Sequence, residues 1–523
     1  MLRLTARRLA LPLFTVILLL SAGIAYAQYD SLPGPAVSFL RDSLDSYVRR
    51  ALADWRIPGA AVCVVKDGRI LVLKGYGVTD LDHPDPVDEN TLFMIGSNTK
   101  AFTATALCLL ESEKKLSLDD PVTRWLPQFR LDNRLAGQQA ILRDLLCHRI
   151  GFRTFQGDFT YWTSNLTRDQ VIEKMAHIKA VYPFRTTWGY TNAAFLTAGQ
   201  VIPRVTGLSW EAFVRQRFFQ PLDMTRTLAL SEELPVATNK CSPYTISGGK
   251  LIRIPFPRID NLAPAGSISS SVHDMSHWLL MQLNHGTYRG KPVIPASVIE
   301  ETRTPASIIG NGGSLFNSGH FALYGLGWFL EEYGGRKIVS HTGGVNGFVT
   351  SVTLVPEERL GILVFTNNDQ NGFYEALKWE ILDAFLDKPY RNYSQVYLGF
   401  FNQQMRQEEA RDQRLRDTVA MHLPTGLSLA AYTGTYSNPV YGTMRVGLES
   451  HSLVMRFSHH PDVRASLSPL GGDRFYVVFS DPELGKAVFP FHVEGGRVRS
   501  VTVKVADFVE YTPYEFTRLG AGK

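Results

Sequence analysis

The sequence predicts an α+β fold, an antiparallel sheet flanked by helices, followed by a small C-terminal antiparallel β-barrel. Strand-like segments rich in β-branched residues open and close the first part of the chain, at about 60–75 and 324–366. Helical patterns of apolar residues fill the interval between them. This order favours one antiparallel sheet built from both ends of the region. After Pro424, short alternating segments separated by glycine turns are typical of a small barrel.

Within the first part, apolar residues at helical spacing predict an opening helix over 37–53. Strands at 60–65 and 70–75 flank Asp67-Gly68, which is a hairpin signal. Further helices are expected over 97–113, 141–147, 168–176, 193–205, 210–219, 272–283, 293–303 and 373–386. Further strands are expected over 324–331, 337–340, 347–355 and 360–366. Aromatic and glycine-rich loops at 154–164 and 309–320 are expected to shape a pocket.

The N-terminus has the pattern of a secretory signal. Three arginines precede an apolar run, and Ala25-Tyr26-Ala27 supplies a cleavage site, so a signal peptide is expected over 1–27. The run is short for a membrane span, so we expect cleavage, no stable span afterwards and a periplasmic or secreted protein; an uncleaved anchor is the alternative. The rest divides into a first domain over 28–390, a polar helical linker over 391–424 and a barrel domain over 425–523.

Charge and cysteine usage exclude several classes of function. The chain has 54 basic and 49 acidic residues and no basic stripe interleaved with aromatic residues, which argues against a nucleic-acid partner. Cys63, Cys108, Cys147 and Cys241 lack metal-ligand spacing; buried thiols are expected, although an exported protein could pair them. No nucleotide-binding loop, zinc motif or other cofactor signature occurs, so we expect chemistry that needs neither a metal nor a cofactor.

One stretch carries the strongest catalytic signal. Ser97 follows a short apolar run that ends at Gly96, and Lys100 comes three residues later, where a helical pattern begins. This spacing places both side chains on one helix face, about 5–6 Å apart at Cβ. An unprotonated amine there can take the serine proton, and the helix start favours an oxyanion. The alternative is a serine that caps the helix beside an exposed lysine.

The same S-x-x-K spacing occurs twice more. Ser112 and Lys115 lie in the polar end of the same helical pattern, and Ser247 and Lys250 flank a glycine turn. Ser97 alone combines a preceding apolar run with a following apolar-faced helix.

Two later stretches offer the other groups that a Ser–Lys nucleophile needs. Trp188-Gly189-Tyr190-Thr191-Asn192 is a turn before a helix. Ser340-His341-Thr342-Gly343-Gly344 ends a strand, where glycine lets the backbone approach a ligand closely. The Tyr-x-Asn pattern recurs at Tyr390 and Tyr436, but both lie after the second stretch in chain order.

In this order the three stretches resemble the serine β-lactamase and penicillin-binding superfamily, whose motifs are S-x-x-K, Y-x-N and K-T-G or H-T-G. Their spacing is similar to that of the class C β-lactamase-like branch, and segments 116–122, 145–151 and 324–328 resemble that branch too. The resemblance covers about 42–386 and implies a β-lactamase/transpeptidase-like fold with an all-helical subdomain. The C-terminal part resembles the lipocalin-like barrel appended to some members.

The resemblance implies three catalytic residues. Ser97 would be the acylated nucleophile, Lys100 its base, and Tyr190 the group that passes protons to and from the leaving group. The alternative for Tyr190 is a core aromatic residue. His148 is expected to be a hydrogen-bonded core or turn residue rather than a catalyst.

It also implies a set of substrate-binding and oxyanion residues: Asn192, His341, Thr342, Gly343 and Gly344. Asn192 would bind the substrate amide, His341 would border the site, and the backbone N–H groups of Ser97 and Gly344 would form the oxyanion hole. The alternatives are a helix cap for Asn192 and a structural role for His341.

The third motif begins with His341 where many relatives have lysine. With an unperturbed pKa near 6.5, histidine would carry only a partial, pH-dependent charge. We therefore expect acyl transfer on an ester or amide of a small molecule or peptide, of esterase or D-amino-acid peptidase type, with β-lactam hydrolysis less favoured. One alternative is a catalytically slow penicillin-binding-like protein that binds peptidoglycan fragments or β-lactams. Another is an interaction protein that acts through its barrel.

Overall fold

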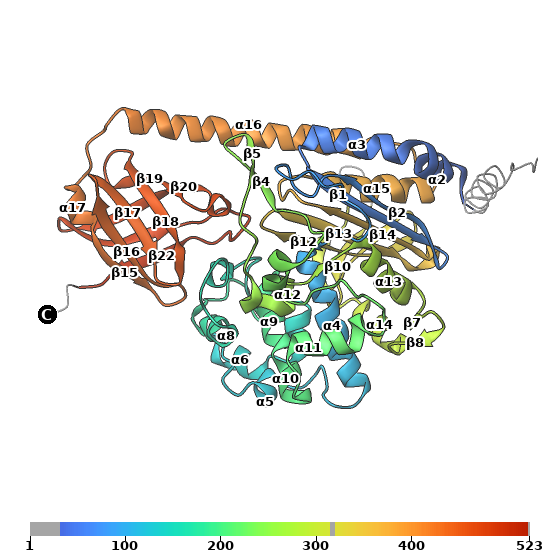
Figure 1. The fold of residues 1–523 in the computed structure, drawn as a ribbon. Helices are drawn as coiled ribbons and strands as arrows, with labels where there is room; N and C mark the ends of the chain where they lie inside the picture. The colour runs from blue at the N-terminus through green and yellow to red at the C-terminus, as the bar shows by residue number, and fades with distance from the viewer. Residues whose placement is uncertain (1–31, 314–318, 521–523) are drawn as a thin grey trace, which may run out of the picture.

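The computed structural model describes residues 32–313 and 319–520. The predicted signal peptide over 1–27 lies outside these residues. A large antiparallel sheet has helices on both faces, and a closed barrel is joined to it by one long helix (Figure 1). The predicted α+β fold followed by an antiparallel barrel is confirmed.

The large sheet brings the two ends of the first region together. Its eight strands run in the order β2-β1-β14-β13-β12-β11-β10-β9, so the early hairpin pairs with the last strand of the group. The turn of that hairpin is Asp67-Gly68, as predicted. The strand bounds are β1 Gly59–Lys66, β2 Arg69–Gly77, β9 Ser307–Asn311, β10 Phe321–Tyr324, β11 Phe329–Tyr333, β12 Arg336–Val345, β13 Phe348–Val355 and β14 Leu360–Thr366.

Strand β1 is apolar and buried up to Val65 because both faces of the sheet are covered. Its alternate residues enter two hydrophobic cores, Ala61, Cys63 and Val65 in one and Ala60, Val62 and Val64 in the other. The second core lies under η1 Ser38–Ser43, α3 Leu44–Trp55 and α15 Phe373–Phe385, with α2 Gly34–Val37 at its end.

The opposite face is covered by the helices that the sequence places between the two groups of strands (Figure 1). Their bounds are α4 Thr99–Ser112, α5 Val122–Trp125, α6 Arg134–Gln139, α7 Leu142–Leu146, α8 Arg168–Lys174, α9 Asn192–Gly199, α10 Val201–Thr206, α11 Trp210–Val214, α12 Ala263–Gly266, α13 Val272–Leu283 and α14 Ala296–Thr302. Three small two-stranded antiparallel sheets lie among them. Two are hairpins, β4 Tyr244–Ser247 with β5 Lys250–Arg253 and β7 Thr287–Tyr288 with β8 Lys291–Pro292, and the third pairs the sequence-distant strands β3 Phe93–Met94 and β6 Ser269–Ser270.

Helix α16 Tyr393–Ala420 leads from the sheet to the barrel (Figure 1). It packs on α3 and α15 at one end and meets the barrel strand β19 at the other. The barrel follows α17 Leu429–Tyr432 and closes with eight strands, β15 Gly434–Asn438, β16 Gly442–Glu449, β17 Ser452–Phe457, β18 His460–Pro469, β19 Arg474–Phe479, β20 Lys486–Glu494, β21 Arg497–Val503 and β22 Tyr514–Arg518.

Two local features differ from the sequence-based predictions. The strand expected over 324–331 is two antiparallel strands, because the chain reverses at residues 325–328, where Gly327 has φ +77°. The part of the chain after Pro424 begins with the short helix α17 rather than with a strand.

The four cysteines are buried free thiols. Burial raises the pKa of Cys63 and Cys108, so both are poor nucleophiles. Within 32–313 and 319–520, every helix is too short or too polar to cross a bilayer.

Candidate active site

Ser97 lies in a tight turn that packs against the central strands β12 and β13 of the large sheet. The 3-10 turn η2 Gly96–Asn98 leads directly into α4, and Gly96 has φ +52°. Asn98 holds this turn by donating to the carbonyl of Ile95 and to the hydroxyl of Thr350 on β13. The turn therefore presents Ser97 beside the sheet, partly exposed, at the first turn of a buried helix.

Strand β12 passes unusually close to this turn. A Cβ on Gly343 would lie 1.8 Å from the carbonyl oxygen of Ile95, and a Cβ on Gly96 would lie 2.9 Å from the backbone nitrogen of Gly344. Only glycine fits at both places. This close approach brings the backbone of Gly344 beside the turn that carries Ser97, which is the arrangement that two oxyanion donors require.

Lys100 is fully buried and contacts Ser97 directly. Its Nζ lies 2.9 Å from Ser97 Oγ, 2.7 Å from Asn192 Oδ1 and 2.8 Å from the Ala265 carbonyl oxygen. The oxygens of Asn192 and Ala265 can only accept hydrogen bonds, so each accepts one N–H of Lys100. A neutral amine has two N–H groups and one lone pair, and the lone pair is then directed at the Ser97 hydroxyl. Burial lowers the pKa of Lys100 well below its usual value, which favours this neutral form.

Tyr190 covers the same pair from the turn before α9. Its ring centroid lies 4.8 Å from Lys100 Nζ. Burial raises the pKa of Tyr190, while a hydrogen bond between its hydroxyl and Ser97 acts in the opposite direction. Tyr190 thus stays a neutral phenol that can relay a proton at Ser97.

Asn192 links Lys100 to a residue that sequence reasoning missed. Its Oδ1 accepts from Lys100, and its Nδ2 donates to Asp158 Oδ2 at 2.7 Å and to the Tyr161 hydroxyl at 3.0 Å. Burial raises the pKa of Asp158 to about 7. Asp158 and Tyr161 belong to the aromatic loop at 154–164 that was expected to shape the pocket. The one feature of the sequence that could have identified Asp158 is that it is the single carboxyl residue in this loop.

His341 is neutral, which corrects the expectation of a partial charge. It is 1% exposed, and burial lowers its pKa to about 3. Nδ1 lies 2.7 Å from the Thr342 carbonyl oxygen, an acceptor, so the ring proton is on Nδ1. Nε2 therefore accepts from the Tyr324 hydroxyl at 3.0 Å. The unperturbed pKa assumed from sequence did not account for this burial.

His148 faces the same interior. Its Nδ1 accepts from the backbone N–H of Thr191 at 3.0 Å, and its ring centroid lies 4.4 Å from that of Tyr190. Burial lowers the pKa of His148 well below its usual value, so a neutral ring supports the turn that carries Tyr190.

The structure brings five of the predicted site residues together. Hydrogen bonds join Ser97 to Lys100, Lys100 to Asn192 and Tyr190 to Ser97, and the ring of His341 lies against that of Tyr190. Thr342 is partly exposed and Gly344 is exposed on the same stretch of β12. The other S-x-x-K pairs lie elsewhere, one at the end of α4 and one in the β4–β5 hairpin. No group of three or more metal-ligating side chains is assembled within the described ranges 32–313 and 319–520.

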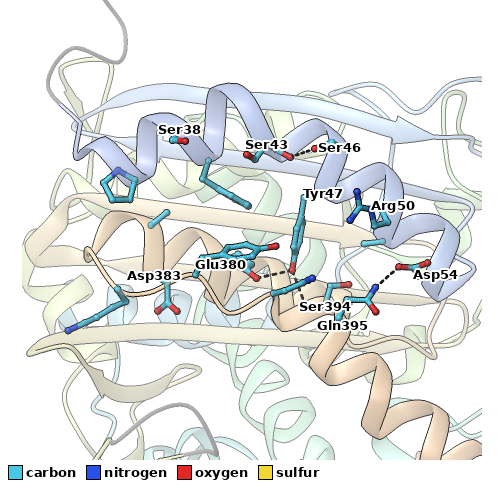
Figure 2. A pocket seen from close by; sticks show the side chains of 17 residues that line it. Ser38, Ser43, Ser46, Tyr47, Arg50, Asp54, Glu380, Asp383, Ser394 and Gln395 are labelled. Atoms are coloured by element: carbon cyan, nitrogen blue, oxygen red, sulfur yellow. Dashed lines mark hydrogen bonds between the residues drawn. The ribbon is translucent and has the colours of Figure 1, made fainter.

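A cavity of about 540 Å³ lies apart from this network, between η1, α3, α15 and the start of α16. Figure 2 shows Tyr47, Glu380 and Ser394 at its centre. Their polar atoms satisfy one another, since the Tyr47 hydroxyl donates to Glu380 and accepts from the Ser394 backbone.

A partly exposed serine beside a fully buried lysine, at the start of a helix and next to a glycine-containing strand, is an arrangement suited to acyl transfer through the serine. The family model described as Beta-lactamase matches residues 44–386, and a second, described as Domain of unknown function (DUF3471), matches residues 421–518. The chain therefore belongs to the beta-lactamase family, and it is a serine hydrolase.

Individual relatives are distant. The chain is 26% identical to the unguisins hydrolase ungD of Aspergillus violaceofuscus over 77% of this chain and 76% of the relative. It is 25% identical to Protein flp of Staphylococcus aureus over 62% and 63%. Among solved structures, the octameric penicillin-binding protein homologue from Pyrococcus abyssi matches 91% of this chain and 99% of its own, with a TM-score of 0.58 at 21% identity. The D-stereospecific amidohydrolase from a Streptomyces species matches 65% and 98%, with a TM-score of 0.52 at 24% identity. These structural likenesses show a shared fold.

Proposed function

We propose that this serine hydrolase is an exported enzyme that cleaves esters or amides through an acyl-enzyme on Ser97. The observation that carries the proposal is the fully buried Lys100 amine, 2.9 Å from the Ser97 hydroxyl and with its pKa lowered by burial. An amine that is neutral near pH 7 can act as a general base without a histidine. The export part rests on the N-terminal sequence alone.

The proposed reaction has two steps. Ser97 Oγ attacks the carbonyl carbon while its proton moves to Lys100, and the backbone N–H groups of Ser97 and Gly344 stabilise the oxyanion. A proton then passes through Tyr190 to the leaving oxygen or nitrogen as its bond to carbon breaks. A water molecule attacks the acyl carbon in the second step, its proton returning through the same groups, and the acid is released.

The neutral ring of His341 favours substrates that carry no charged group on the side that faces this residue. A lysine there would offer a fixed positive charge to a substrate carboxylate, whereas His341 offers none in the neutral pH range. We therefore favour short acyl esters and amides of D-amino acids over β-lactams. The name of the similar unguisins hydrolase agrees with a hydrolytic reaction, and the name of the similar D-stereospecific amidohydrolase denotes the cleavage of an amide.

A substrate panel tests this function. Short p-nitrophenyl esters, D-amino-acid amides, D-Ala-D-Ala peptides and nitrocefin are each assayed with wild type and Ser97→Ala. We expect Ser97-dependent turnover of an ester or amide that exceeds nitrocefin turnover. Rapid Ser97-dependent nitrocefin hydrolysis would overturn the substrate preference. An acyl-enzyme that accumulates without turnover on every substrate would instead indicate the slow penicillin-binding-like alternative.

A further inference from the structure

The loop between β21 and β22 of the barrel reaches the candidate active site. Glu510 on this loop is 1% exposed, although a glutamate is rarely so deeply buried. Its Oε1 accepts from the backbone N–H of Gly157 at 2.7 Å, and its Oε2 accepts from that of Phe159 at 3.2 Å. One carboxylate therefore holds the backbone on both sides of Asp158.

The same loop lies against other parts of the site. The ring of Phe508 would be 3.7 Å from a Cβ on Gly344, and the Phe508 and Trp162 ring centroids are 5.5 Å apart. Tyr511 stacks on Phe155, whose ring also contacts Tyr190. From within the barrel, the Tyr441 hydroxyl donates to Glu510 Oε2. Glu510 is therefore fixed from both domains.

A continuous chain of contacts leads from this carboxylate to the nucleophile. Glu510 holds the backbone around Asp158, Asp158 accepts from Asn192, Asn192 accepts from Lys100, and Lys100 contacts Ser97. We propose that Glu510 is a positioning residue for the Ser97–Lys100 pair, fixing the Asp158 loop and controlling how much negative charge Asp158 presents to Lys100. This inference rests on the proposed function, because it assigns Lys100 the role of base.

The charges along this series of contacts support an effect of Glu510 on Lys100 through Asp158. Burial raises the pKa of both Glu510 and Asp158 to about 7, and the Glu510 charge contributes to the shift at Asp158. An ionised Asp158 in turn favours the protonated form of Lys100.

The buried tyrosines and histidines that face this series of contacts stay neutral. Lys504 on the same loop forms an ion pair with Asp507, and its Nζ also donates to the backbone carbonyl of Glu510. Tyr161 faces Asp158, and Tyr441 and Tyr514 face Glu510; burial raises the pKa of all three phenols. The neutral rings of His148 and His341 face Lys100. His460, on the barrel strand β18, stacks on Phe159 of the Asp158 loop, and burial lowers the pKa of His460 to about 4.

The test follows the rate at which a fluorophosphonate labels Ser97 between pH 5 and pH 9. In Glu510→Gln, loss of the neighbouring charge lowers the pKa of Asp158, so Lys100 holds its proton to higher pH. We expect the acid-side midpoint of the rate profile to rise by about 0.5 unit or more. Asp158→Asn should move the midpoint down, and adding Glu510→Gln to Asp158→Asn should produce no further movement.

Two variants separate this role from general docking of the barrel. Asp462→Asn removes an exposed ion pair with Arg258 between the same two domains and should leave the midpoint unchanged. If Glu510→Gln does not fold, Tyr441→Phe removes the barrel's hydrogen bond to Glu510 and should shift the midpoint upward by a smaller amount. A lower melting temperature or labelling yield with an unmoved midpoint in the folded variants would overturn the inference. Wild type that is not labelled at Ser97 at any pH would instead overturn the proposed function.

Discussion

The side-chain nitrogen of Lys100 lies 2.9 Å from the hydroxyl oxygen of Ser97; the lysine is fully buried, whereas the serine at the helix start is partly exposed. An ammonium at this place loses its hydration, so burial favours the neutral amine. The two acceptors beside it, on Asn192 and Ala265, direct its remaining lone pair at the serine. In the proposed reaction, this relationship lets Lys100 act as the base without a charged histidine.

Replacement of Lys100 by methionine should remove the base and keep the volume of the side chain. Because general-base catalysis contributes about 10²–10⁴-fold, we expect kcat/KM for a p-nitrophenyl ester to fall by at least about 100-fold. Lys115→Met is the matched control, since Lys115 belongs to another S-x-x-K pair at the exposed end of the same helix and should keep wild-type activity. Activity of Lys100→Met within a few-fold of wild type would contradict the assignment.

Two neighbouring glycines of β12 should respond differently to alanine. A Cβ on Gly343 would lie 1.8 Å from the Ile95 carbonyl oxygen, whereas a Cβ on Gly344 would have only van der Waals neighbours at 3.7 Å or more. We expect Gly343→Ala to destabilise the fold by about 3 kcal/mol or more and Gly344→Ala by less than about 1 kcal/mol. Urea unfolding of both variants provides the comparison. Equal destabilisation by the two substitutions would contradict the close contact between Gly343 of β12 and the turn that carries Ser97.

The pH profile of the enzyme should contain no step from His341. Its pKa of about 3 leaves the ring neutral from pH 5 to pH 9, so its protonation cannot shape activity there. His341→Gln should reduce kcat while the midpoint of kcat/KM against pH stays within about 0.3 unit of wild type. A wild-type midpoint near 6.5 that disappears in His341→Gln would show that His341 titrates.

A second buried carboxyl pair joins the domains away from the nucleophile. Asp369 and Glu483 hydrogen-bond to each other, and burial raises the pKa of both. A carboxyl whose folded pKa is raised stabilises the fold at low pH, and this contribution is lost as pH rises from the unfolded pKa near 4 through the folded value.

Glu483→Gln keeps the side-chain shape and lets an amide donate to the Asp369 carboxylate. We expect its melting temperature to exceed that of wild type by about 2–4 °C at pH 8 and by less at pH 5. Glu494→Gln, at an exposed barrel position paired with Arg499, should match wild type at both values. If the difference in melting temperature between Glu483→Gln and wild type were the same at pH 5 and pH 8, it would contradict raised pKa values at Asp369 and Glu483.

The sequence predicted which helices and strands carry the site residues better than it predicted the burial and protonation of those residues. Apolar periodicity identified the hairpin around Asp67-Gly68 and the helix that follows Ser97, since both depend on local patterns. Chain order separated Ser97 and Tyr190 from similar motifs elsewhere. The protonation of His341 could not be predicted in the same way, because it depends on burial by residues distant in sequence.

The contribution of the barrel was also beyond sequence reasoning. Glu510 meets Gly157 across more than 300 residues of chain, and no periodic pattern reports which loop of a barrel docks on its neighbour. Asp158 lay inside an aromatic loop that matched none of the three motifs. Both residues became candidates only once hydrogen bonds and burial were known.

The most direct test of the central claim is the intact mass of the protein after reaction with a fluorophosphonate. Wild type should gain one adduct per chain, located at Ser97 by peptide mapping, and Ser112→Ala should gain the same adduct. Ser97→Ala should remain unmodified under the same conditions. Full-stoichiometry labelling of folded Ser97→Ala would contradict the assignment of Ser97 as the nucleophile.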